Sequence, residues 1–103
     1  MAKFLYAYTG GGIAQTPEDR EKAMAAWGAW FGALGDAVVD MGNPFAGSTA
    51  LATDGSTVAA RAGLTGYSLV RADSLELAAE LARDCPVLAD GGSVEVYEAH
   101  EVM

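Results

Sequence analysis

The order strand, helix, strand is predicted twice along this chain, and this repetition limits the folds open to it. The first unit begins with the alternating segment KFLYAY (residues 3–8) and enters a helix at Thr16-Pro17. The second begins with GYSLVRA (residues 66–72) and enters a helix at DSLE (residues 73–76). Thr16 and Asp73 are suitable helix caps, and proline at a first helical position favours a helix start.

The other ends of the predicted helices and strands follow from the positions of glycine and proline and from the alternation of side chains along the strands. We expect the first helix to end near Leu34-Gly35 and the second, residues 74–83, to end before Pro86. Further strands are expected at residues 37–41 and 93–99, and a β-hairpin at residues 48–52 and 57–60 around the Asp-Gly turn. The sequence therefore predicts one α+β domain over residues 1–103. We expect a ferredoxin-like βαββαβ sandwich with an inserted β-hairpin, and an antiparallel sheet carrying both helices on one face.

The first strand is apolar on both faces, which predicts a partner. Phe4, Tyr6 and Tyr8 alternate with Leu5 and Ala7. Helices on one side of the sheet would leave the second apolar face in water. Pairing with a second copy is the simplest way to cover that face, so we expect a homodimer.

The first helix carries two stripes. The larger residues Met24, Trp27, Phe31 and Leu34 share one stripe, with Trp30 at its border. Small residues form the other, namely Ala25, Gly28, Ala29 and Gly32. Each interior glycine costs about 1 kcal/mol relative to alanine. Either another backbone or a ligand comes close to this small stripe, or the helix is loosely packed there.

The net charge limits the possible binding partners of the protein, and the single cysteine bears on its cellular compartment. Fourteen acidic against six basic residues give a net charge of −8, and the basic residues are scattered, which argues against nucleic acid. One cysteine allows no intrachain disulfide and suits the cytoplasm. We find neither a signal-peptide pattern nor an apolar run of about 20 residues, so we expect no membrane partner.

The last third of the chain resembles the YCII-related family, which includes the DGPF-domain proteins. The segment GLTGYSLVRADSLELAAELARDCPVLADGGSVEVYE carries the resemblance, strongest over residues 63–98. The DGPF signature itself is replaced by Asp54-Gly55-Ser56-Thr57. The resemblance implies ferredoxin-like subunits that pair into a dimeric α+β barrel, a cleft bounded by both sheets, and a family mostly without assigned reactions.

Some relatives are thought to use a histidine and an aspartate as a proton-transfer pair. These positions fall on Met24 and Cys85 here, and neither side chain can act in such a pair. Asp84 is adjacent, but a neighbouring residue at a helix end points elsewhere. The resemblance therefore does not extend to a His/Asp general base in this chain.

Three other features have a structural and a functional interpretation. Cys85 is either a buried structural residue or a nucleophile, and its position at a helix C-terminus favours the first. The glycines at residues 10–12 form either a loop beside a cleft or, less well supported, an anion site. His100, the only histidine, is expected at the surface, and we expect no metal site and no cofactor.

The aromatic residues suggest either a core or a ligand pocket. Aromatics at strand and helix spacing usually form core, but tyrosine hydroxyls can also orient a flat ligand. Our leading hypothesis is a homodimer that binds a small organic molecule. The alternatives are a cofactor-free isomerase, lyase or oxygenase using tyrosine or aspartate, and a regulatory module linked to sigma-factor systems, with which DGPF-type relatives are associated. The predicted cleft residues are Tyr6, Tyr8, Met24, Trp27, Asp40, Asn43, Tyr67 and Cys85.

Overall fold

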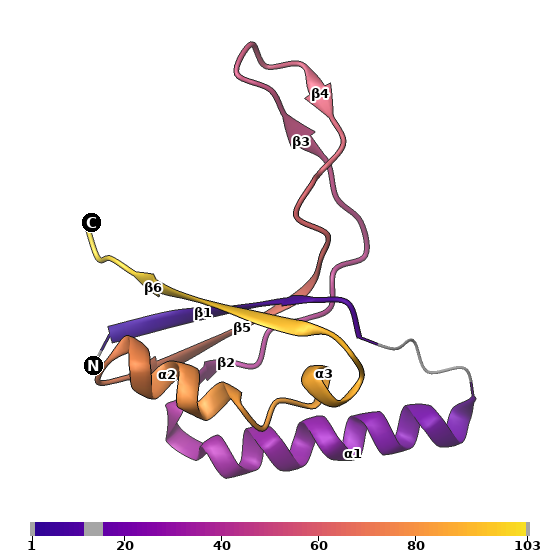
Figure 1. The fold of residues 1–103 in the computed structure, drawn as a ribbon, viewed down its shortest axis with the longest axis vertical. Coiled ribbons are helices and arrows are strands. Elements are labelled where there is room, and N and C mark those ends of the chain that lie inside the picture. Colours follow the sequence, from indigo (N-terminus) through magenta and orange to yellow (C-terminus); the bar gives the residue numbers. More distant parts are fainter. Residues whose placement is uncertain (1, 12–15, 103) are drawn as a thin grey trace.

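A computed structural model describes residues 2–11 and 16–102 (Figure 1). In chain order the elements are β1 (Ala2–Thr9), α1 (Pro17–Leu34), the 3-10 turn η1 (Gly35–Ala37), β2 (Val38–Asp40), β3 (Ala50–Leu51), β4 (Thr57–Val58), β5 (Leu64–Ala72), α2 (Leu75–Ala82), α3 (Pro86–Ala89) and β6 (Ser93–Ala99). The predicted order of strands and helices is confirmed, with α3 added.

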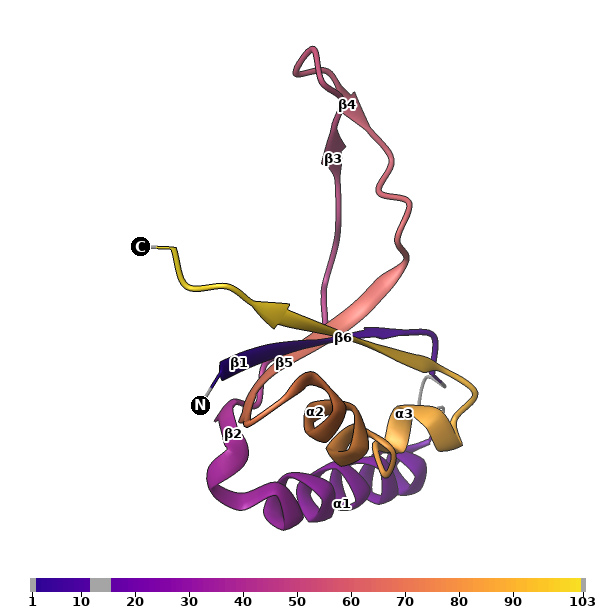
Figure 2. The same cartoon turned by 60° about the vertical axis from the view of Figure 1, so that its left-hand side comes forward.

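The main sheet has four strands in the order β2-β5-β1-β6, and its pairings are antiparallel. The helices α1, α2 and α3 lie on one side of it (Figure 2). This order, with the two central strands coming from the two different units, is the ferredoxin-like arrangement that the repeated pattern predicts. The fold class is therefore confirmed for the single chain.

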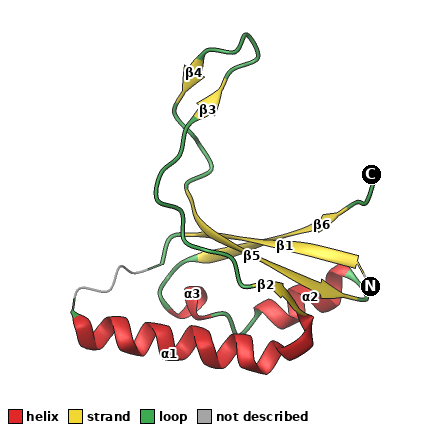
Figure 3. Cartoon of the chain, turned by 180° about the vertical axis from the view of Figure 1, so that it is seen from behind, coloured by secondary structure: helices red, strands yellow, loops and turns green. Residues whose placement is uncertain are grey.

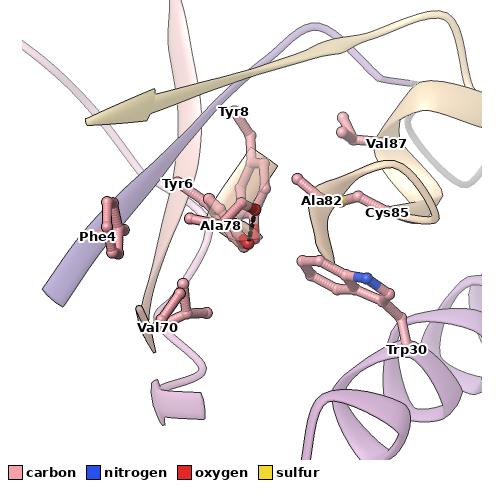
Figure 4. Close-up of a cluster of buried hydrophobic side chains, with 10 residues drawn as sticks. Phe4, Tyr6, Tyr8, Trp30, Val70, Ala78, Ala82, Cys85 and Val87 are labelled. Atoms are coloured by element: carbon pink, nitrogen blue, oxygen red, sulfur yellow. Dashed lines mark hydrogen bonds between the residues drawn. The ribbon is translucent and has the colours of Figure 1, made fainter. Parts of the chain in front are cut away.

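The core lies between the sheet and the helices. Phe4, Tyr6 and Tyr8 of β1 are buried on the helix side, and Val70 lies beside them on β5 (Figure 4). The Tyr6 hydroxyl donates to the backbone carbonyl of Ala78 in α2. Strand alternation therefore places the largest β1 side chains against the helices, as expected from the period of two.

The packing of α1 differs from the predicted stripe. Trp30, placed at the border, is the buried residue at 5% exposure, whereas Met24 is 70% exposed. The last turns of α1 pack on α2, where the Trp30 Nε1 group donates to the Leu81 carbonyl at 3.1 Å. Met24 instead lines a hollow of the surface that is described below. The predicted stripe was wrong about which of these residues is covered.

The ends of the second helix also differ in detail. Ser74, not Asp73, is the cap of α2, and its side chain accepts from the Leu77 amide at 3.1 Å. Pro86 does not lead into a loop, because it is the first residue of the short helix α3. Cys85 therefore lies at the start of α3. By contrast, the Thr16 cap of α1 is confirmed, since its hydroxyl oxygen accepts from Asp19.

The inserted hairpin forms an arm that projects from the domain. Its two strands are shorter than predicted, and they pair only as Ala50 with Val58 and Leu51 with Thr57. The arm rises on the side of the sheet opposite the helices (Figures 2 and 3). We refer below to residues 46–63 as the arm.

Candidate functional site

A cleft of about 780 Å³ opens where β2 is too short to cover β5. Its walls come from the first half of α1, the end of β1, the connection from β2 to β3, the start of β5, and α3. The lining is predominantly apolar, and Arg20 and Asp90 are the charged residues in it. The lining residues are Tyr8, Gly10, Gly11, Arg20, Ala23, Met24, Trp27, Phe31, Met41, Gly42, Asn43, Pro44, Phe45, Thr65, Gly66, Tyr67, Ser68, Val87 and Asp90.

One wall exists because residues 41–45 run tightly along β5. Gly42 has a φ of +74°, and a Cβ atom there would lie 1.7 Å from the Tyr67 carbonyl oxygen. Asp40 Oδ1 accepts from the Gly42 amide at 2.8 Å, and the Asn43 carbonyl accepts from the Tyr67 amide at 3.3 Å. Only glycine fits this close approach, and it places Asn43 and Phe45 at the cleft.

Paired aromatic rings form two parts of the lining. The rings of Tyr8 and Trp27 meet edge to face, with their centroids 5.1 Å apart. Across the strand edge, Phe45 and Tyr67 are stacked at 5.7 Å. Rings in these arrangements support one another, and each pair adds apolar surface at this edge of the sheet.

A hydrogen-bonded chain crosses the inner end of the cleft. The Tyr8 hydroxyl donates to Ser68 Oγ at 2.8 Å, and Ser68 Oγ donates to the Met41 carbonyl at 2.6 Å. Burial raises the pKa of Tyr8 well above its usual value, although the bond to Ser68 opposes this shift. Tyr8 is therefore neutral at ordinary pH, and its oxygen retains accepting capacity.

Cys85 is buried behind the cleft and does not line it. Its side chain is 2% exposed, and burial raises the pKa of its thiol to about 11. It lies at the start of a helix, contrary to the expected helix end, so burial and not a helix C-terminus keeps the thiol neutral. A neutral, enclosed thiol is a poor nucleophile, which favours the structural interpretation.

The structure brings some predicted cleft residues together and separates others. Tyr8, Met24, Trp27, Asn43 and Tyr67 line the cleft. Tyr6 is fully buried in the core, and Cys85 lies behind the cleft wall. Asp40 is exposed outside the cleft, and its carboxylate accepts from the Gly42 amide. Tyr8 and Asp40 therefore do not meet as an acid-base pair.

Several lining residues were absent from the sequence prediction. Ser68 looked like an ordinary strand residue, and its role depends on its hydrogen bonds to Tyr8 and Met41. Phe45 follows Pro44 in a segment without periodicity, and only its stacking on Tyr67 identifies it. Phe31 belongs to the predicted helix stripe, and it lines the cleft as well.

The other candidate sites are weaker. A second hollow of about 900 Å³ lies between α1 and the segment from α2 to α3, and it is lined largely by alanines and charged residues. Gly10 and Gly11 line the cleft, as a loop beside it would, while Gly12 lies outside the described residues. His100 is exposed after β6. Within residues 2–11 and 16–102, no cluster of acidic, histidine or cysteine side chains could hold a metal.

Fold and cleft define a small ferredoxin-like α+β protein with an aromatic hollow at one sheet edge. Comparison with known protein families matches residues 2–102 to the YCII-related domain, so the chain belongs to the YCII-related family. Searches of curated proteins and of solved structures each returned no match. Among the described helices, none has the length and apolarity needed to cross a membrane.

Proposed function

We propose that the protein binds a small, flat and largely apolar organic molecule in the aromatic cleft, and that it does so as a homodimer. The observation that carries the first part is the set of large apolar side chains left exposed around one hollow. Met24, Met41 and Phe45 are 70%, 60% and 44% exposed, and all three line the cleft. Apolar lining with a few polar groups is typical of small-molecule sites.

The polar groups of the cleft support a ligand with a single hydroxyl or similar group. The Tyr8 oxygen can accept a hydrogen bond while its own O–H group donates to Ser68. Asn43 is a second polar residue of the lining. The charged residues Arg20 and Asp90 have opposite signs, so they favour no net ligand charge.

The proposal is tested by titrating the protein with 2-naphthol, a flat apolar ring system with one hydroxyl, and following amide and methyl NMR shifts. We expect saturable shifts at Met24, Trp27 and Tyr67. The saturated analogue decahydro-2-naphthol has a similar size but is not flat, and we expect it to bind at least about tenfold more weakly because it cannot stack on the rings. Shifts spread over the whole surface, or no shifts, would overturn the binding proposal.

A matched pair of variants localises the site. Met24→Glu places a charge in the cleft at a largely exposed position, so the variant should fold and lose 2-naphthol binding. Leu77→Glu makes the same kind of change at an exposed residue of α2 outside the cleft, and binding should persist. Equal loss in both variants would contradict the proposed location.

The rival enzyme hypothesis receives less support from the site. Tyr8 is held protonated by burial, so it can donate or accept a hydrogen bond but is a poor base. Asp40 lies outside the cleft lining. Conversion of a bound compound, lost in Tyr8→Phe, would favour the enzyme. A melting temperature raised only by another protein, and not by 2-naphthol, would favour the regulatory module.

A further inference from the structure

A groove with small residues on its floor runs between α1 and the segment from α2 to α3. It is the second hollow, of about 900 Å³. Ala26, Ala29 and Ala33 of α1 line it, and residues three or four positions apart share one face of a helix. The opposite wall includes Leu81, Pro86 and Ala89. We call this hollow the alanine groove.

The half of α1 that borders the groove is apolar on all sides but only partly covered. Residues 23–34, AMAAWGAWFGAL, contain no charged side chain. Within this stretch Trp30 is the one buried residue, whereas Ala26, Ala29 and Ala33 are exposed. A helix that is apolar all round is normally buried. The exposed alanines therefore favour a further element that covers this side of α1.

Acidic residues outnumber basic ones along the groove. Its charged lining residues are Asp19, Lys22, Glu80, Asp84 and Asp90. Glu80 is paired with Arg83, with 2.8 Å between Oε2 and Nε. Within residues 2–11 and 16–102 this is the one ion pair, so Asp84 and Asp90 have no cation of this chain beside them. The charge of the groove is therefore complementary to a basic partner.

The shape of the groove favours a helix over a small molecule. Alanine side chains are short and carry no polar group, so they hold a small ligand poorly but let a second helix come close to α1. Packed helices have axes about 8–10 Å apart, depending on the side chains between them. An amphipathic helix in such a groove lays its apolar face on the floor and leaves its polar residues at the rim. Here the rim would face them with carboxylates.

We propose that the alanine groove binds a basic amphipathic helix of another protein. The apolar face of that helix lies on the alanines of α1, and its lysines or arginines pair with Asp84 and Asp90. The groove shares Ala23, Trp27 and Asp90 with the aromatic cleft, so the two hollows meet at Trp27. This inference goes beyond the proposed small-molecule binding and does not depend on it.

The test uses the full chain and a synthetic peptide of about 18 residues, because shorter isolated helices are marginal in water. Leucines at every third or fourth position form its apolar face, and lysines form the rest. We expect saturable binding with NMR shifts at Ala29, Ala33 and Leu81, weakened by salt. A peptide with glutamate in place of lysine should not bind. A scrambled peptide of the same composition, which lacks the apolar face, should bind at least about tenfold more weakly.

Two pairs of variants localise the contact at exposed positions, where the chain should still fold. Ala33→Gln puts a longer polar side chain on the groove floor, and Ala25→Gln makes the same change on α1 outside the groove. Only Ala33→Gln should weaken peptide binding, by about tenfold or more. Asp84→Lys should weaken it as well, whereas Glu98→Lys changes the net charge equally on β6, outside the groove, and should have little effect.

Four results would overturn this inference. The first is the absence of saturable peptide binding. The second is equal binding of the scrambled peptide, or displacement of the leucine-lysine peptide by spermine, because either would show attraction by charge alone. The third is equal loss of binding in the two glutamine variants. The fourth is a dimer, followed by sedimentation, that dissociates in Ala33→Gln but not in Ala25→Gln, since a second copy would then occupy the groove. None of them decides the 2-naphthol titration, because Met41 and Tyr67 line the cleft and not the groove.

Discussion

The indole nitrogen of Trp30 donates a hydrogen bond to the backbone carbonyl of Leu81, with 3.1 Å between the two atoms. This bond ties α1 to α2 inside the core, where Trp30 is 5% exposed. The same ring lies 5.9 Å from that of Tyr6, measured between centroids. Trp30 therefore links the outer helix both to the second helix and to the central strand.

Replacing Trp30 should test this link. Trp30→Phe keeps an aromatic ring but leaves the Leu81 carbonyl without its partner, so the free energy of unfolding should fall by about 1–3 kcal/mol. Trp30→Ala also creates a cavity and should cost about 3–5 kcal/mol. Urea unfolding measures both. The half-buried Trp27 is the comparison: a Trp27→Phe variant that loses as much stability as Trp30→Phe would contradict the role given to this bond.

Two glycines should respond to alanine in opposite directions. At Gly42 a Cβ atom would meet the Tyr67 carbonyl oxygen at 1.7 Å, and φ is +74°. Gly42→Ala should therefore lower the melting temperature substantially, with a loss above about 2 kcal/mol. At Gly28, inside α1, a Cβ atom would have no neighbour within 4 Å. Gly28→Ala should raise stability by about 0.5–1 kcal/mol. Destabilisation by Gly28→Ala would instead indicate that another chain packs on the small stripe.

The chain from Tyr8 through Ser68 to the Met41 carbonyl should show energetic coupling. Tyr8→Phe removes one donor and leaves Ser68 bonded to Met41, so we expect a loss of about 1 kcal/mol. Ser68→Ala leaves both the tyrosine hydroxyl and the carbonyl unpaired and should cost more. The double variant should cost less than the sum of the single changes, by about 0.5–1.5 kcal/mol in a chemical-denaturation cycle. Strict additivity would mean that the two side chains act independently.

Stability should fall in the alkaline range because of Cys85. Its thiol titrates near 9.0 when unperturbed and near 11 in the folded protein. Between these values the unfolded chain has lost the proton and the folded chain retains it, so the free energy of unfolding falls as pH rises from about 9 to 11. The contribution is roughly 3 kcal/mol, because each pKa unit corresponds to about 1.4 kcal/mol. In the Cys85→Ala variant the free energy of unfolding should change less between pH 9 and 10. The buried tyrosines contribute their own pH dependence mainly above this range. An unchanged slope in that variant would exclude the thiol as its source.

Local signals were sufficient for most of the elements. Thr16 and Pro17 start α1 as predicted, and Gly35 ends it. Alternation in residues 3–8 correctly placed Phe4, Tyr6 and Tyr8 on one buried face. These features depend on residues close together in the chain, so a sequence pattern can encode them.

The mistakes arose where one signal serves two purposes. Pro86 cannot continue α2, but a proline also suits the first position of a new helix, and here it starts α3. The helical wheel showed that Met24 shares a stripe with Trp27, but not which turns of α1 lie over α2. That depends on where the two helices meet, which the bond from Trp30 to Leu81 reveals.

The cleft was only partly accessible to sequence reasoning. Tyr8, Met24, Trp27, Asn43 and Tyr67 were named as cleft residues and do line it, but their binding role stays a prediction. Ser68 and Phe45 were not found, because their roles rest on contacts with distant segments. The direction of the arm could not be predicted either, because the Asp-Gly signal predicts a hairpin turn but not the direction in which the hairpin projects from the sheet.

The sequence by itself determined the strand and helix order, the ferredoxin-like topology and the family, because periodicity, caps and turn residues act over a few neighbouring positions. Only the tertiary structure shows that residues 41–45 run close along β5, with glycine required at position 42, and that an aromatic cleft lies there. It also decided that the arm rises on the side of the sheet opposite the helices. The physical reason is that both depend on how separate segments approach one another in space, which no spacing along the chain records.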